Sequence, residues 1–181
     1  MSSKSITIKV VVDAGIYRRF YMFEKFSRKH GLLKIIIFIS VLSAFAALLL
    51  VRQEIILGVV LLFFGLGLPA YNIWNFFRTL ELQIKAFDLE DPKEIYSLHF
   101  TDDPIGIEVT NHGGGEEPLR YEWDKLHGAY RFDECIYLYV LPNKAFLLPD
   151  GQSDADSDAL WQLFSNMLPP KNIQDRRKKN K

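Results

Sequence analysis

Two long apolar runs dominate the hydrophobic pattern of this 181-residue chain. Residues 32–51 read LLKIIIFISVLSAFAALLLV, with Lys34 as their only charge, and residues 55–77 read IILGVVLLFFGLGLPAYNIWNFF, with no charge. Each run has the length of about 20 residues that crosses a hydrocarbon core of about 30 Å. The polar residues 52–54 predict a tight turn between them, because one continuous helix would be more than twice as long as that core is thick.

We therefore expect a transmembrane helical hairpin over residues 32–78, with spans at 32–51 and 55–77. A pair of helices buried in a soluble core is a poor alternative, because the remaining chain is too short to surround two helices that are apolar on every face. A cleaved signal peptide also fits poorly, since the first run starts about thirty residues into the chain and a second run follows at once.

The distribution of charge predicts the orientation of the hairpin. The formal net charge is zero, but the bases and acids are separated along the chain. Seven bases and two acids precede the first run, 18 acids and six bases fall in residues 81–170, and six bases and one acid fall in residues 171–181. Lysine and arginine near the ends of spans favour the cytoplasmic side. This predicts a multi-pass protein of the cell (plasma or inner) membrane with both termini in the cytoplasm.

The segment before the hairpin, residues 1–31, combines a strand pattern with a basic helix pattern. Apolar side chains alternate in residues 5–12, and Asp13 is placed to cap a helix over residues 15–30. That helix is basic and aromatic, which suits a membrane surface, although packing on the soluble domain is an almost equal alternative. The candidate membrane-surface contacts of the chain are Arg18, Arg19, Lys25, Arg28, Lys29, Lys34 and Arg78.

The second apolar run contains features that bear on helix packing. Pro69 predicts a kink, and Gly65 and Gly67 predict close packing against the first helix; a gate or binding notch is the less favoured interpretation. Tyr71 and Trp74 lie near the end of the run and are candidate interfacial aromatics.

Residues 79–170 predict a small antiparallel β domain. After a continuation of the second helix to about residue 87, short alternating or wholly apolar runs cover residues 96–100, 105–109, 119–123, 128–132, 135–140 and 145–148. Asp156 or Ser157 begins a last amphipathic helix, which Pro169 ends. The fold class is α+β: a membrane hairpin plus a half-barrel closed by a C-terminal helix. Residues 171–181 predict a disordered basic tail.

This order of parts resembles the bacterial YcxB-like family. The residues that carry the resemblance are 121–126 (YEWDKL), 136–139 (IYLY) and 145–149 (AFLLP). The resemblance covers nearly the whole chain and implies a C-terminal domain similar to a pleckstrin-homology (PH) fold. Asp150 follows the last motif where a basic residue is common in the family. The resemblance implies no established activity.

The sequence predicts no enzyme, no cofactor and no metal site. The single cysteine, Cys135, lies in an apolar strand and is expected to be buried and inert. His99 with Asp102 and Asp103 forms the best candidate for catalysis, but a strand end followed by a polar turn explains these residues more simply. The predicted function is a membrane-anchored interaction or regulatory module.

The predicted partners of this module are the lipid bilayer and either an unknown protein or a second copy of the chain. No nucleic acid or small-molecule substrate is expected. The alternatives are a subunit of an oligomeric transporter or channel, and a membrane-bound enzyme.

Overall fold

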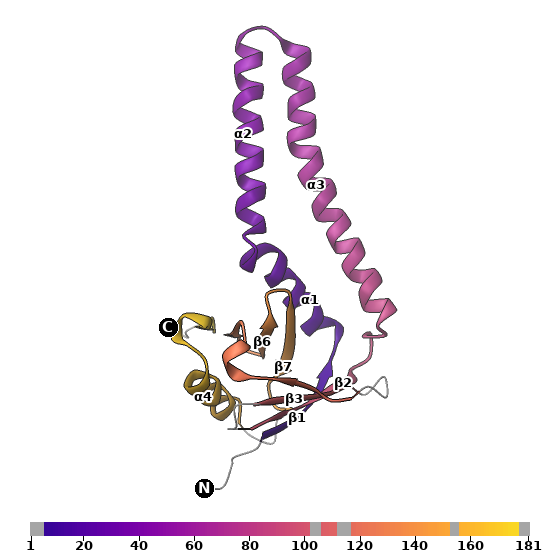
Figure 1. Cartoon of the computed structure of the whole chain (residues 1–181). Coiled ribbons are helices and arrows are strands. Elements are labelled where there is room, and N and C mark those ends of the chain that lie inside the picture. The colour runs from indigo at the N-terminus through magenta and orange to yellow at the C-terminus, as the bar shows by residue number, and fades with distance from the viewer. Residues whose placement is uncertain (1–5, 102–105, 112–116, 153–155, 178–181) are drawn as a thin grey trace. The chain divides into compact units, whose positions relative to one another are not determined.

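The computed structural model describes residues 6–101, 106–111, 117–152 and 156–177. Within these ranges the chain is an α+β structure with two long apolar helices and two β-sheets (Figure 1). It divides into two compact units. The sheet unit comprises Met1–Ile16 and Asp91–Lys181, and the helical unit comprises Tyr17–Glu90.

The helical unit follows the pattern expected from the sequence. Helix α1 (Ala14–Met22) leads into the π-helical segment η1 (Phe23–Arg28), and the two long helices are α2 (Gly31–Val51) and α3 (Ile55–Ala86). The predicted cap is confirmed, because the Asp13 carboxylate accepts a hydrogen bond of 2.7 Å from the Ile16 amide. Both long helices have the length and composition needed to cross a membrane.

Residues in the left-handed conformation end both long helices. Gln53 (φ 63°) follows α2 and Asp88 (φ 54°) follows α3. In each case the next amide turns back to the helix, with Glu54 N–H donating to the Leu49 carbonyl at 2.9 Å and Leu89 N–H donating to the Ile84 carbonyl at 3.0 Å. This is the Schellman arrangement, which satisfies carbonyl groups left open at a helix end. The predicted turn at residues 52–54 is therefore formed by hydrogen bonds within the hairpin.

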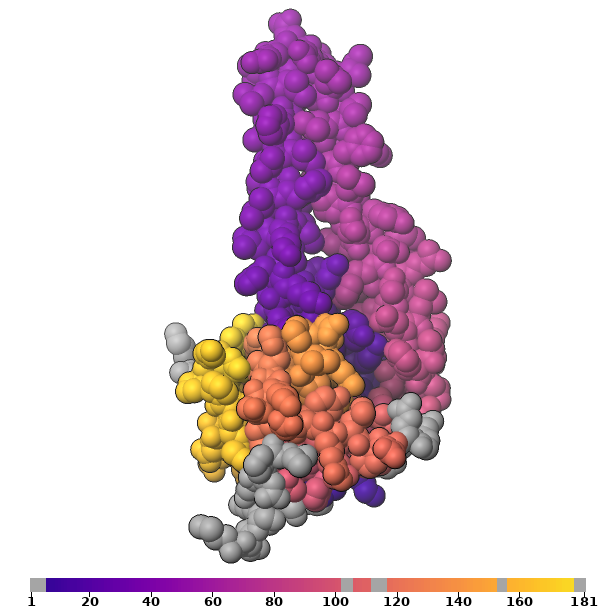
Figure 2. Space-filling view, viewed as in Figure 1, coloured from indigo at the N-terminus to yellow at the C-terminus, as the bar shows by residue number. Residues whose placement is uncertain are grey.

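The two long helices lie side by side in the hairpin (Figure 2), and glycines of α3 set their close packing. A β-carbon on Gly58 would lie 2.8 Å from the Leu50 side chain, and one on Gly65 would lie 3.1 Å from that of Leu42. Gly67 meets no atom within 4 Å, so the expected role of Gly67 in packing is wrong while that of Gly65 is confirmed. α3 remains helical through Pro69.

The first sheet of the sheet unit joins the start of the chain to its middle. Its strand order is β1-β2-β3-β4, all antiparallel, with β1 (Ile6–Val12), β2 (Lys93–Phe100), β3 (Ile107–Asn111) and β4 (Leu119–Tyr121). The strand predicted before the hairpin thus pairs with the first strand after it, in a register that sets Ile8 opposite Leu98. One face of β1 is buried, as its alternation predicts.

The second sheet has the order β7-β6-β5-β8. Its strands are β5 (Gly128–Arg131), β6 (Cys135–Leu141), β7 (Lys144–Pro149) and β8 (Ile173–Asp175). β6 is buried on both faces as expected, and Cys135 is buried with it. The prediction of disorder from residue 171 is wrong for residues 171–175, because a 3-10 turn and β8 form there and β8 pairs parallel to β5. The sheet is therefore mixed rather than purely antiparallel.

Helix α4 (Ser157–Met167) packs on an aromatic cluster in the core of the sheet unit. The Phe164 ring lies 5.4 Å from that of Phe100 and 6.0 Å from that of Trp123. Trp123 was expected in a strand but begins the 3-10 turn η2 (Trp123–Lys125). Its indole N–H donates to the Thr101 carbonyl at 3.0 Å and its ring covers Gly106, where no side chain would fit. These contacts explain why the strand stops at Tyr121.

Two polar side chains join the sheets at one corner. The Tyr96 hydroxyl accepts from the Leu147 amide at 2.8 Å and donates to the Leu147 carbonyl at 3.2 Å. The Gln152 carboxamide accepts a hydrogen bond from the Val11 amide at 2.7 Å and donates one to the Val11 carbonyl at 2.9 Å. These bonds lie beside the register shift between Val10 and Val11 in β1. Burial raises the pKa of Tyr96 above its ordinary value, so its hydroxyl keeps the proton that it donates.

The substitution Tyr96→Phe is expected to lower the free energy of unfolding by about 1–2 kcal/mol, because it leaves both backbone groups of Leu147 without this partner. Urea unfolding of the full-length protein in detergent measures the change. Tyr121→Phe is the matched control on the same sheet, since its exposed hydroxyl bonds only the Lys144 ammonium among the described residues. Equal losses in the two variants would contradict the role assigned to Tyr96.

Candidate functional site

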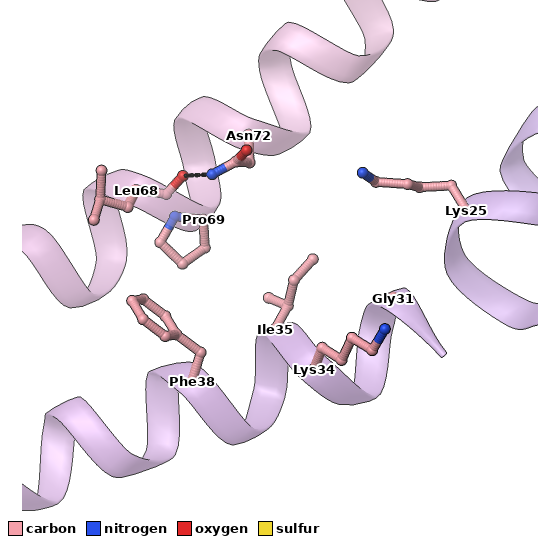
Figure 3. Close-up of a pocket in the computed structure, with 8 residues that line it drawn as sticks. All are labelled: Lys25, Gly31, Lys34, Ile35, Phe38, Leu68, Pro69 and Asn72. Atoms are coloured by element: carbon pink, nitrogen blue, oxygen red, sulfur yellow. Dashed lines mark hydrogen bonds between the residues drawn. The ribbon is translucent and has the colours of Figure 1, made fainter. Parts of the chain in front are cut away.

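A groove in the helical unit combines charged and apolar side chains (Figure 3). It has a volume of about 360 Å³. η1 supplies one side chain, and α2 and α3 supply the two walls. The lining residues are Lys25, Gly31, Lys34, Ile35, Phe38, Leu68, Pro69 and Asn72.

A sharp turn of the chain between η1 and α2 forms the mouth of the groove. His30 adopts the left-handed conformation (φ 53°), and the next residue, Gly31, lies so close to the Lys25 carbonyl that a β-carbon would overlap it. A residue without a side chain is therefore required at the first position of α2. The turn sets Lys25 beside the first turns of α2, as Figure 3 shows.

The groove is polar at one end and apolar at the other. Lys34 and Asn72 lie near the mouth, whereas Phe38 and Leu68 lie one helical turn farther toward residues 52–54 along α2 and α3. The Asn72 amide donates one hydrogen bond to the Leu68 carbonyl at 2.9 Å, which uses one of its two N–H groups. The buried ring of Pro69 forms part of the wall.

The two lysines of the groove give its lining a positive charge. Within the described part of the chain, neither Lys25 nor Lys34 forms an ion pair with a carboxylate. The Lys25 ammonium lies 5.9 Å from the centre of the Phe76 ring. Both side chains are exposed.

Most other predicted membrane-surface cations are engaged differently. Arg18 donates two hydrogen bonds of 2.8 Å to Glu81, which raise the pKa of Arg18 above its ordinary value. Arg28 and Lys29 share the Glu24 carboxylate, each at 2.8 Å. Arg18, Arg28 and Lys29 are therefore paired with acids, which distinguishes them from Lys25 and Lys34 of the groove.

The remaining sequence candidates lie on exposed helix surfaces. Arg19 is exposed on α1. Tyr71 and Trp74 are both exposed on α3 with their rings 6.0 Å apart, and the Arg78 guanidinium lies 5.6 Å from the centre of the Trp74 ring. Residues 71, 74 and 78 are spaced to share one helix face.

The histidine considered for catalysis has a structural contact. His99 Nδ1 lies 2.9 Å from the Thr7 hydroxyl across the β1–β2 pair. Asp102 and Asp103, the acids considered with it, lie outside the described residues. Over the described ranges no group of three or more His, Cys, Asp and Glu side chains is placed to hold a metal ion.

Comparisons of the chain with protein-family models, with curated proteins and with solved structures found no match.

The sequence indicates the lysines of the groove, and it offers a binding notch at Pro69 only as the less favoured interpretation of that residue; Pro69 lines the groove together with the lysines. Lys25 and Lys34 were grouped with the other bases by charge alone. What distinguishes them from those bases is the pairing of the other bases with Glu24 and Glu81. Glu24 lies four residues before Arg28, a spacing at which helix side chains meet, whereas Arg18 and Glu81 are far apart in sequence. The spacing of Glu24 and Arg28 could have predicted their ion pair, whereas no feature of the sequence indicates the contact between Arg18 and Glu81.

Proposed function

We propose that this protein is a membrane-anchored, non-enzymatic interaction or regulatory module. The helical hairpin spans the cell membrane at residues 32–51 and 55–77, and the sheet unit lies at the cytoplasmic face. The observation that carries the proposal is the exposed apolar surface of the hairpin. In the most apolar stretches of α2 and α3, only 6% and 17% of residues are buried, respectively. Helices in the core of a soluble protein are mostly buried, whereas lipid covers exposed apolar side chains at low cost.

The pairing of β1 with β2 supports the two-span topology. β1 precedes the hairpin and β2 follows it, and the two strands pair along their length. A sheet cannot form across a bilayer, so residues 12 and 93 must lie on the same side, which requires an even number of crossings. The bases near both ends of the hairpin and the single base in its turn, Arg52, favour the cytoplasm for that side.

The strand order supports a PH-like fold for the sheet unit. The unit begins with the four antiparallel strands β1–β4. Three further antiparallel strands, β5–β7, and the helix α4 follow, and β8 is added at an edge of the second sheet. The hairpin would then be an insertion between the first two strands of that fold. The architecture agrees with the YcxB-like resemblance, which we retain as a proposal.

The proposed surface for a protein partner is the edge strand β4. Among the described residues β4 pairs only with β3, and its Leu119 side chain is 40% exposed. A free edge offers backbone groups to an added strand, and an exposed leucine adds apolar contact. The partner is another protein or a second copy of the chain.

Cysteine labelling of intact cells tests the topology. With Cys135 replaced by serine, a membrane-impermeant maleimide is expected to label Gln53→Cys from outside, and Gln174→Cys only after permeabilisation. Labelling of Gln174→Cys in intact cells would refute the cytoplasmic placement.

Crosslinking in native membranes tests the interaction role. We expect the full-length chain to form a defined crosslinked species that Leu119→Asp abolishes. Leu141→Asp is the control, because Leu141 is also exposed but lies at the end of β6. If the unmodified chain forms no crosslinked species, or if the two variants crosslink equally, the result would count against the proposed surface.

A further inference from the structure

The groove between η1, α2 and α3 has the layout of a lipid-binding site. We propose that it binds an anionic glycerophospholipid, with the phosphodiester between the ammonium groups of Lys25 and Lys34 and an acyl chain against Phe38 and Leu68. This inference rests on the proposed membrane insertion of the hairpin and identifies a ligand for one end of it.

Charge complementarity is the first argument for an anionic occupant. Lys25 and Lys34 present two positive charges to one recess with no carboxylate partner among the described residues. Arg28 and Lys29, on the same segment as Lys25, share the single carboxylate of Glu24. An anion in the groove would supply the balancing charge that Glu24 supplies to its neighbours.

The order of polar and apolar groups is the second argument, and it favours a lipid over a free anion. Lysine and amide groups lie at the mouth, and Phe38 and Leu68 lie one turn deeper along the helices. A phospholipid has the same order, with the charged headgroup at the surface and the acyl chains beneath. The Asn72 amide keeps one N–H that can donate to a phosphate or glycerol oxygen.

The depth and size of the groove agree with this assignment. Lys34 is the only charged residue in its apolar run, close to the end where headgroups would lie. The volume of about 360 Å³ is within the roughly 300–1,000 Å³ of small-molecule sites. It accommodates a headgroup and the upper part of one chain, while the remainder of the lipid stays in the bilayer.

The test measures lipid binding by the full-length protein in nanodiscs and in detergent. Native mass spectrometry counts phosphatidylglycerol bound against phosphatidylcholine, which lacks net charge. We expect one phosphatidylglycerol to bind preferentially. The double variant Lys25→Gln/Lys34→Gln is expected to lose roughly 30-fold in affinity for it, about fivefold for each lysine.

Two matched variants separate a built site from general attraction to an anionic surface. Lys29→Gln/Arg78→Gln removes two charges from the same end of the hairpin but touches no lining residue, and its loss is expected to be less than threefold. Leu68→Trp fills the apolar part with no change of charge and is expected to displace the bound lipid. Helical content by circular dichroism verifies that each variant is folded.

The outcomes distinguish this inference from the proposed function. Equal losses in the two charge variants, retention of lipid by Leu68→Trp, or equal binding of both lipids would overturn the lipid site and leave the membrane anchor intact. Failure of the unmodified chain to enter nanodiscs would overturn both.

Discussion

Replacing Phe164 with alanine is expected to lower the free energy of unfolding of the sheet unit by about 3–5 kcal/mol. Phe164 is fully buried, and its ring packs edge-on against Phe100 and at a tilt against Trp123. The substitution removes the aromatic contacts of α4 with the core. The residues around Phe164 belong to β2 and η2, whose hydrogen bonds limit collapse into the cavity. This loss is a large part of the total stability of about 5–15 kcal/mol that is typical of a folded domain.

Pulse proteolysis of the full-length protein in urea measures this loss, with Trp fluorescence as a second probe because Trp123 contacts the deleted ring. Gln162→Ala is the control on the same helix, since Gln162 is exposed and alanine favours helix. A loss below about 1 kcal/mol for Phe164→Ala, or one equal to that of Gln162→Ala, would show that α4 does not close the core in the way described.

Gly58→Ile is expected to separate α2 from α3 at the half of the hairpin nearest the turn, at a cost of about 3 kcal/mol. Even a β-carbon at this position would lie within 3 Å of Leu50 and 3.3 Å from the Ala46 carbonyl. Close approach of backbones is the main source of attraction between helices in lipid, because lipid is as apolar as the side chains themselves. The larger side chain therefore removes close contacts between the helices, and in lipid no hydrophobic driving force compensates for their loss.

Gly67→Ile is the matched control, because the same side chain on the same helix meets open space. Spin labels at Val41→Cys and Leu66→Cys, with Cys135 replaced by serine, report the distance between the helices. We expect a longer and broader distance distribution in Gly58→Ile and an unchanged one in Gly67→Ile. The same distribution in both variants would contradict the packing assigned to Gly58.

The elements that could be predicted from the sequence are those whose signal is local. The two apolar runs, the polar turn and the alternation of residues 6–12 each contain their own pattern, and the observed helices and strand follow it. The burial of β6 was also predictable, because it is apolar on both faces. A helix cap at Asp13 needed only the residue type and its position.

The features that could not be predicted depend on residues distant in sequence. β8 is three residues long and includes Gln174 and Asp175, so it is recognisable only by its pairing with β5. Trp123 continues an alternating pattern but leaves the strand because its indole covers Gly106 and bonds Thr101. The partner of β1 lies beyond the whole hairpin, and nothing local to either strand specifies that register.

The candidate site likewise combines residues that have a local sequence signal with a geometry that has none. Lys25 and Lys34 were identified as basic residues near a span, which follows from composition. The groove that contains them requires the left-handed His30 and the close approach of Gly31 to the Lys25 carbonyl. Gly31 is the first residue of α2, immediately before the apolar run, and the sequence around it carries no signal that indicates this close approach.

The pairing of β1 with β2 also constrains the order of events during synthesis. β1 leaves the ribosome first, but its partner is made only after the next 80 residues, 13–92, have emerged. Its apolar face therefore stays accessible to chaperones or to misassembly until residues 13–92, which include the hairpin proposed to cross the membrane, have been made. In the proposed topology, a nascent chain whose second helix did not cross the membrane could not pair β1 with β2. Formation of this sheet therefore depends on correct insertion of both helices.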